Sequence, residues 1–138
     1  MEKIDYHKAV ASFEKESNKR TNFSYDPVSD KAYDVSNLED ANELYKQYGN
    51  GVDPIYIIGV TNNATGKLDN ETMKAYLDLQ KDGKVPFLGQ WTSPSGKKFK
   101  DVSYLDGNID ETEALRLKTL FNQEGVLKVK SNGRWEII

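Results

Sequence analysis

Hydrophobic residues near the start of the chain alternate first at helical and then at strand spacing. Residues 1–18 place Tyr6, Val10 and Phe13 on one stripe surrounded by Lys and Glu, which predicts an amphipathic helix. Residues 23–36 alternate aromatic and polar side chains around an Asp-Pro turn. This second pattern predicts a hairpin of two short strands.

A second helix and a buried strand follow the hairpin. Ser36 or Asn37 caps the helix, because a side-chain oxygen at either position can accept from the free amides of the first turn. Residues 54–58 are too short and too β-branched for a helix, and they predict a central strand buried on both faces.

The second half of the chain repeats this order of elements. Asp69 caps a helix, residues 87–91 and 98–103 form a hairpin, and Asp110 caps a further helix. Two strands then close the chain, at 126–130 and 134–138. A β-bulge at Lys100 is expected, because simple alternation would put Phe99 and Val102 on opposite faces of the sheet.

The segment 23–36 resembles the segment 91–103 in its Pro, Ser, Lys and Asp-Val-Ser positions. We therefore predict an internally duplicated α-β-β-α-β unit, with copies at about 1–64 and 65–138. The two copies share one core in a single domain, residues 1–138. The predicted class is α+β, with a mainly antiparallel sheet and an extra C-terminal hairpin strand.

Composition excludes several kinds of chemistry. The 138 residues contain no cysteine and one histidine, which removes disulfides, thiolate catalysis and sulfur-bound zinc. The acidic segment Asp106–Asp110 resembles the start of a calcium loop, but it lacks the glycine and the final glutamate and is better explained as a helix cap. We predict no catalytic residues, no metal and no cofactor.

Hydropathy bears on location. The first residues lack a continuous apolar stretch of the signal-peptide kind, and no apolar run approaches the roughly 18 residues of a membrane span. The expectation is a soluble, cytoplasmic protein without a membrane partner.

Basic and aromatic residues are interleaved in the C-terminal half, although the net charge is −3. On one face of a sheet, cations can neutralise phosphates while rings stack on bases, which predicts nucleic-acid binding as one alternative. The other interpretation makes the rings core residues and the lysines a solvated face. The candidate residues are Trp91, Lys97, Lys98, Lys100, Lys128, Lys130 and Arg134.

Tyrosine content suggests recognition of a protein. The chain has eight tyrosines, and the spacing leaves Tyr25, Tyr56 and Tyr104 near the surface. The alternative is a tyrosine-rich core with hydroxyls at its rim.

Two similar Asp-Val-Ser segments bring a third hypothesis. Asp34 with Ser36 and Asp101 with Ser103 could meet at the junction of the two copies, where paired carboxylates raise a pKa. Such a junction would suit a small-ligand binder or a carboxylate-based enzyme.

The functional prediction is a non-enzymatic interaction module. Its partner would be a protein, with homodimerisation as a further option. Small duplicated domains of this kind resemble adaptors and inhibitors encoded by mobile elements or viruses. Nucleic-acid binding and the carboxylate junction remain the two alternatives.

Overall fold

The computed structural model describes residues 3–34, 36–61 and 68–138. This part of the chain forms four helices and one seven-stranded antiparallel sheet, which confirms the α+β class. In chain order the elements are α1 (Tyr6–Ser17), β1 (Phe23–Asp26), β2 (Lys31–Tyr33), α2 (Leu38–Tyr48), β3 (Ile55–Gly59), α3 (Asn70–Lys81), β4 (Pro86–Thr92), β5 (Lys98–Asp106), α4 (Glu111–Leu120), β6 (Leu127–Val129) and β7 (Trp135–Ile137).

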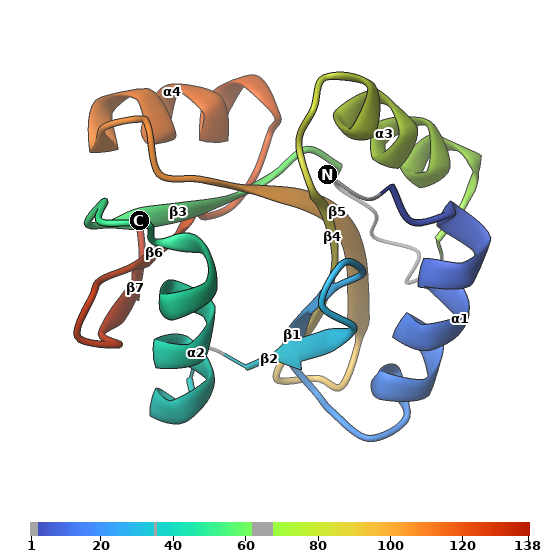
Figure 1. Ribbon diagram of the computed structural model, residues 1–138. Coiled ribbons are helices and arrows are strands. Elements are labelled where there is room, and N and C mark those ends of the chain that lie inside the picture. The colour runs from blue at the N-terminus through green and yellow to red at the C-terminus, as the bar shows by residue number, and fades with distance from the viewer. Residues whose placement is uncertain (1–2, 35, 62–67) are drawn as a thin grey trace.

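The sheet is curled, and its strands run in the order β2-β1-β4-β5-β3-β6-β7. Figure 1 shows α1 and α3 side by side against one face, and α2 on the opposite side of the sheet. The long strand β5 bends through the centre of the molecule between these helices.

Side-chain alternation along β3 divides the core into two parts. Tyr56 and Ile58 belong to the larger cluster, which includes the buried residues of α1, α3 and α4. Ile57 packs with Leu44 of α2, and Ile55 packs with Ala41 of the same helix. The prediction that this strand is buried on both faces is confirmed, because all five of its residues are buried.

The structure confirms the predicted N-caps of three helices. Asn37, not Ser36, caps α2 and accepts from the amides of Glu39 and Asp40. Asp69 and Asp110 cap α3 and α4 as expected. Each side-chain oxygen satisfies amides that the first turn of a helix leaves free.

The predicted bulge at Lys100 is wrong. The register from Trp91↔Phe99 to Leu88↔Val102 is uninterrupted, so Phe99 and Val102 do lie on opposite faces. A bulge is unnecessary because the face that carries Phe99 is not filled by core at this end of the sheet. Asp101 points to the same face as Phe99.

The internal duplication is not confirmed. The order of elements repeats, but the strand pairing does not: β3 lies between β5 and β6, whereas its counterpart β6 lies between β3 and β7. The sheet therefore does not relate the two halves by a simple two-fold operation.

Candidate functional site

A pocket of about 480 Å³ opens on the sheet face that α2 covers only in part. Ile57 and Leu127 line this pocket and also belong to the core cluster beneath α2, which places both on one face. Pockets that bind small molecules commonly measure about 300–1,000 Å³, so this volume suits a metabolite-sized ligand. We call it the sheet pocket, and its lining includes Ile57, Gly59, Gly89, Trp91, Phe99, Lys100, Asp101, Ser103, Gln123, Glu124, Leu127 and Ile137.

Two strand glycines make room in the floor of the pocket. A Cβ atom on Gly89 would lie 2.4 Å from Oδ1 of Asp101, and one on Gly59 would lie 2.4 Å from Oε1 of Gln123. Glycine weakens a strand interior and often marks a close approach by another group. Here the side chains of Asp101 and Gln123 occupy the space that a larger residue at position 89 or 59 would need.

Asp101 is the chemically unusual residue of the pocket. No described residue donates a hydrogen bond to its carboxyl group or forms an ion pair with it. Burial raises the pKa of this carboxyl from 3.8 to about 6, because the charged form loses hydration. The residue is half-buried, and its remaining exposed surface lies in the pocket.

The other walls combine apolar and aromatic groups. Ile57, Leu127 and Ile137 line one part of the pocket, while the rings of Trp91 and Phe99 pack 5.1 Å apart at another. The side chain of Trp91 is 48% exposed, so much of its ring is free to contact a ligand. The pocket can therefore hold an apolar body beside the carboxyl group of Asp101.

The structure gathers part of the predicted residue set into this site. Trp91, Lys100, Asp101 and Ser103 all line the sheet pocket. The amine of Lys100, however, reaches Glu14 of α1 at 3.2 Å and lies near the Phe13 ring, on the other face of the sheet. It therefore does not neutralise Asp101.

The predicted meeting of Asp34 and Asp101 is wrong. Strands β1 and β4 lie between β2 and β5, so the two carboxylates are on separated strands. Asp34 instead accepts hydrogen bonds from the amide and hydroxyl of Ser36 in the turn before α2. It serves local structure and does not pair with Asp101.

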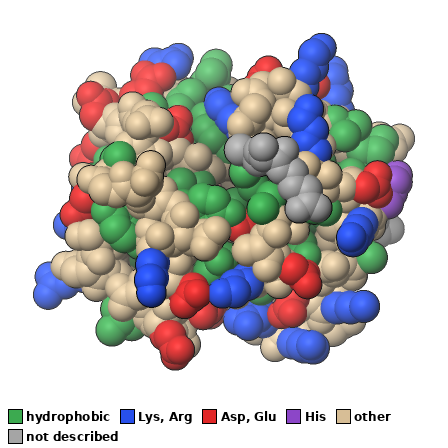
Figure 2. Space-filling model, viewed as in Figure 1, with side chains coloured by type: hydrophobic (Ala, Val, Ile, Leu, Met, Phe, Trp, Pro, Cys, Tyr) green, Lys and Arg blue, Asp and Glu red, His purple; other side chains and the backbone are tan. Residues whose placement is uncertain are grey.

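The basic residues do not converge on one surface. Lys97 and Lys98 lie at the β4–β5 turn, while Lys130 and Arg134 lie at the β6–β7 turn, at the opposite end of the strands. Lys128 pairs with Glu111 at 2.8 Å and Glu136 at 3.5 Å. On the face shown in Figure 2, Lys and Arg side chains are interspersed with Asp and Glu.

The expectation of surface tyrosines is also wrong, and so is that of buried tryptophans. Tyr25, Tyr56 and Tyr104 are at most 4% exposed, and the hydroxyl of Tyr25 donates to Asp30 at 2.6 Å. Trp91 and Trp135 are both more than 40% exposed. The structure therefore contains the tyrosine-rich core of the alternative interpretation.

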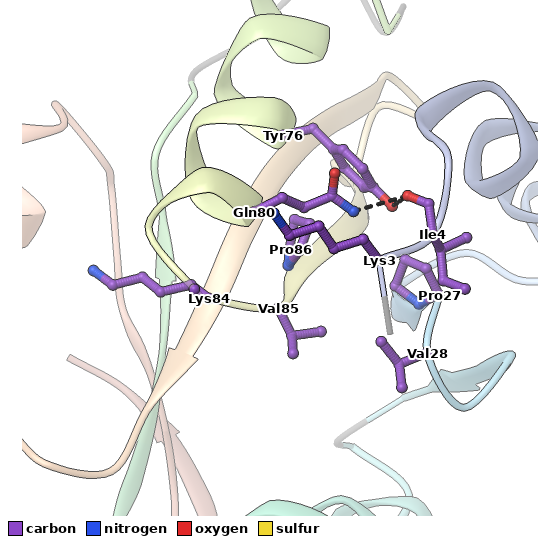
Figure 3. Close-up of a pocket in the computed structure, with 10 residues that line it drawn as sticks. Lys3, Ile4, Pro27, Val28, Tyr76, Gln80, Lys84, Val85 and Pro86 are labelled. Carbon is purple, nitrogen blue, oxygen red and sulfur yellow. Dashed lines mark hydrogen bonds between the residues drawn. The ribbon is translucent and has the colours of Figure 1, made fainter. Parts of the chain in front are cut away.

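A second hollow lies beside the N-terminal segment and is shown in Figure 3. There Tyr76 and Gln80 of α3 both donate hydrogen bonds to the carbonyl oxygen of Ile4, each at 2.8 Å. Its volume of about 60 Å³ is enough for a few water molecules but not for a metabolite. These bonds attach the segment before α1 to α3 and do not form a binding site.

Comparison of the chain with models of protein families, with curated proteins and with solved structures finds no match. None of the helices among the described residues is long and apolar enough to cross a membrane. Among those residues there is also no group of three His, Cys, Asp or Glu side chains placed to hold a metal ion. The site must be interpreted from its own chemistry.

Proposed function

We propose that this protein binds a small molecule in the sheet pocket. The observation that carries the proposal is the carboxyl of Asp101, which lies in a pocket of metabolite size and has no partner among the described residues. An isolated carboxyl in a partly apolar site lowers the stability of the folded state unless a ligand completes its hydrogen bonds. The residues around it, small at Gly59 and Gly89 and aromatic at Trp91, are consistent with a binding role.

A neutral apolar fluorophore tests this proposal without knowledge of the natural ligand. N-phenyl-1-naphthylamine should show a saturable rise in emission with the wild-type protein, because the apolar walls shield it from water. Gly89→Leu directs a side chain into the pocket next to Asp101 and should remove at least nine-tenths of the rise, measured by fluorescence titration.

Thr112→Leu is the matched control, since it adds the same side chain at an exposed position of α4. It should leave the titration unchanged, and circular dichroism should confirm that both variants fold. Equal emission from wild type and Gly89→Leu would contradict binding in the sheet pocket.

We infer a protein partner as a second candidate function, supported by the edge strand β7. All three residues of this strand are exposed, including Trp135 and Ile137, and β7 is the last strand of the sheet. Ile138 exchanges both backbone hydrogen bonds with Val126, so the alternate residues Trp135 and Ile137 direct their amide and carbonyl groups away from β6. Such an edge can accept a strand from another protein.

Trp135→Lys should therefore abolish capture of a stoichiometric partner from the source cell lysate, because a lysine on an edge opposes strand addition. Leu77→Lys changes an equally exposed hydrophobic residue of α3, away from the edge, and should retain the partner. The captured proteins are compared by gel electrophoresis after nuclease treatment, which removes proteins held only through nucleic acid. Loss in both variants, or in neither, would contradict recognition through β7.

A further inference from the structure

Two side chains over the floor of the sheet pocket, those of Gln123 and Asp101, present hydrogen-bond acceptors that no described donor reaches. Gln123 shows this most clearly, because its Nε2 donates to the carbonyl oxygens of Thr61 at 2.9 Å and Phe121 at 3.0 Å. Those two bonds use both amide hydrogens and determine which atom is nitrogen and which is oxygen. The Oε1 atom consequently lies over Gly59, on the pocket side, with no described donor.

Asp101 supplies the second acceptor group. Its Oδ1 atom lies over Gly89, and no donor among the described residues reaches the carboxyl. This atom lies on the β4 side of β5, whereas Oε1 of Gln123 lies over Gly59 of β3, on the other side of β5. A ligand that satisfies either acceptor must bring a donor.

The charges around the pocket favour a cation. Besides Asp101, the pocket lining includes the carboxylate of Glu124, which is exposed. The lysine of the lining, Lys100, directs its amine to Glu14 on the other face. No basic side chain among the described lining residues is therefore available to pair with Asp101.

The remaining lining is suited to an apolar group. Ile57, Leu127 and Ile137 provide aliphatic contact, and the exposed ring of Trp91 can contact a flat group or the cation itself. The pocket thus combines hydrogen-bond acceptors with apolar surface.

We propose that the ligand is an amphipathic organic ammonium, whose cationic nitrogen donates to the carboxylate of Asp101 while its apolar body packs against the aliphatic and aromatic walls. This inference rests on the proposed small-molecule function. The folded protein already bears the cost of burying Asp101, so an ammonium that enters contributes charge-assisted hydrogen bonds and loses only its own hydration.

Three probes of similar shape separate charge from apolar contact: phenethylamine, phenethyl alcohol and hydrocinnamate, titrated at about pH 7.5. The readout is the amide resonances of Gly59 and Gly89 in the protein NMR spectrum. Phenethylamine should shift both resonances with an affinity about tenfold or more above that of the alcohol, and hydrocinnamate should bind more weakly than either.

A variant of the pocket carboxylate and a matched variant outside the pocket complete the test. Asp101→Asn should reduce phenethylamine affinity about tenfold and leave the alcohol unchanged, whereas Asp78→Asn, at an exposed position of α3, should have little effect. If the alcohol or hydrocinnamate binds as tightly as the amine, the ammonium inference is overturned and the pocket function stands. If all three probes leave Gly59 and Gly89 unshifted while N-phenyl-1-naphthylamine also fails, both proposals are overturned.

Discussion

Asp101→Asn is expected to stabilise the protein by about 2 kcal/mol near pH 7.5, although it removes the central group of the sheet pocket. The pKa of Asp101 rises from 3.8 to about 6 in the folded protein because burial disfavours the carboxylate. A rise of about two pKa units corresponds to about 3 kcal/mol, which access of water through the pocket reduces. Asparagine has nearly the same shape without the charge.

The stabilisation should depend on pH in a defined direction. Because the folded-state pKa exceeds the unfolded value, the folded protein binds more protons between about pH 4 and pH 6. Wild-type stability therefore falls as the pH rises through this window. Urea unfolding should give nearly equal free energies for wild type and Asp101→Asn at about pH 4, and a difference that reaches its full size above about pH 7.

Glu124→Gln is the control for this prediction, since it neutralises an exposed carboxylate of the same pocket. Its effect on the free energy of unfolding should stay within about 0.5 kcal/mol at either pH. A stability difference for Asp101→Asn that does not change with pH would show that the charge of Asp101 carries no burial cost.

Asp26→Ala is expected to have the opposite effect and to destabilise the protein by about 3 kcal/mol. Asp26 is 0% exposed, and its carboxylate accepts from the amide of Val28 at 3.0 Å, the hydroxyl of Ser29 at 2.8 Å and the hydroxyl of Tyr48. These bonds join the β1–β2 turn to α2. Removing the acceptor leaves several donors without a partner in a region closed to water.

Thermal unfolding followed by circular dichroism measures this loss, which should lower Tm by about 10 °C. Tyr48→Phe removes one of the three bonds and should cost about 1 kcal/mol. Asp78→Ala removes an exposed carboxylate of α3 and should leave Tm almost unchanged. A fall no larger than that of Asp78→Ala would mean that the Asp26 contacts do not stabilise the fold.

Asp26 and Asp101 are two carboxylates removed from bulk water to different degrees, and we expect their substitutions to have opposite effects. Asp26 receives its donors from residues within three positions and from one helix that packs beside it. Asp101 faces the strand glycine Gly89 and receives no donor from the described residues. The first carboxylate stabilises the fold, whereas the second is available for a ligand.

Most helices and strands of this protein could be predicted from its sequence, because their signals are local. Asp69 and Asp110 cap helices through amides two or three residues away, and the Asp-Pro turn lies between the two strands that it joins. The prediction failed where spacing alone had to decide burial: Tyr56 and Tyr104 were expected near the surface and are at most 4% exposed. Strand alternation gives a face, but the neighbours of that face come from elsewhere in the chain.

The residues of the sheet pocket could be predicted from the sequence less well than the helices and strands, because tertiary structure brings them together. The sequence pointed to Asp101, Ser103 and Trp91 for other reasons, but nothing in it paired Asp101 with Gly89 or brought Gln123 over Gly59. Those contacts depend on strand register and on the path of the chain after α4, which are set by long-range packing. Sequence therefore determined the class of fold and most of its elements, through interactions a few residues long. Tertiary structure alone decided which carboxylate would be left without a partner, because a partner is defined by neighbours in space.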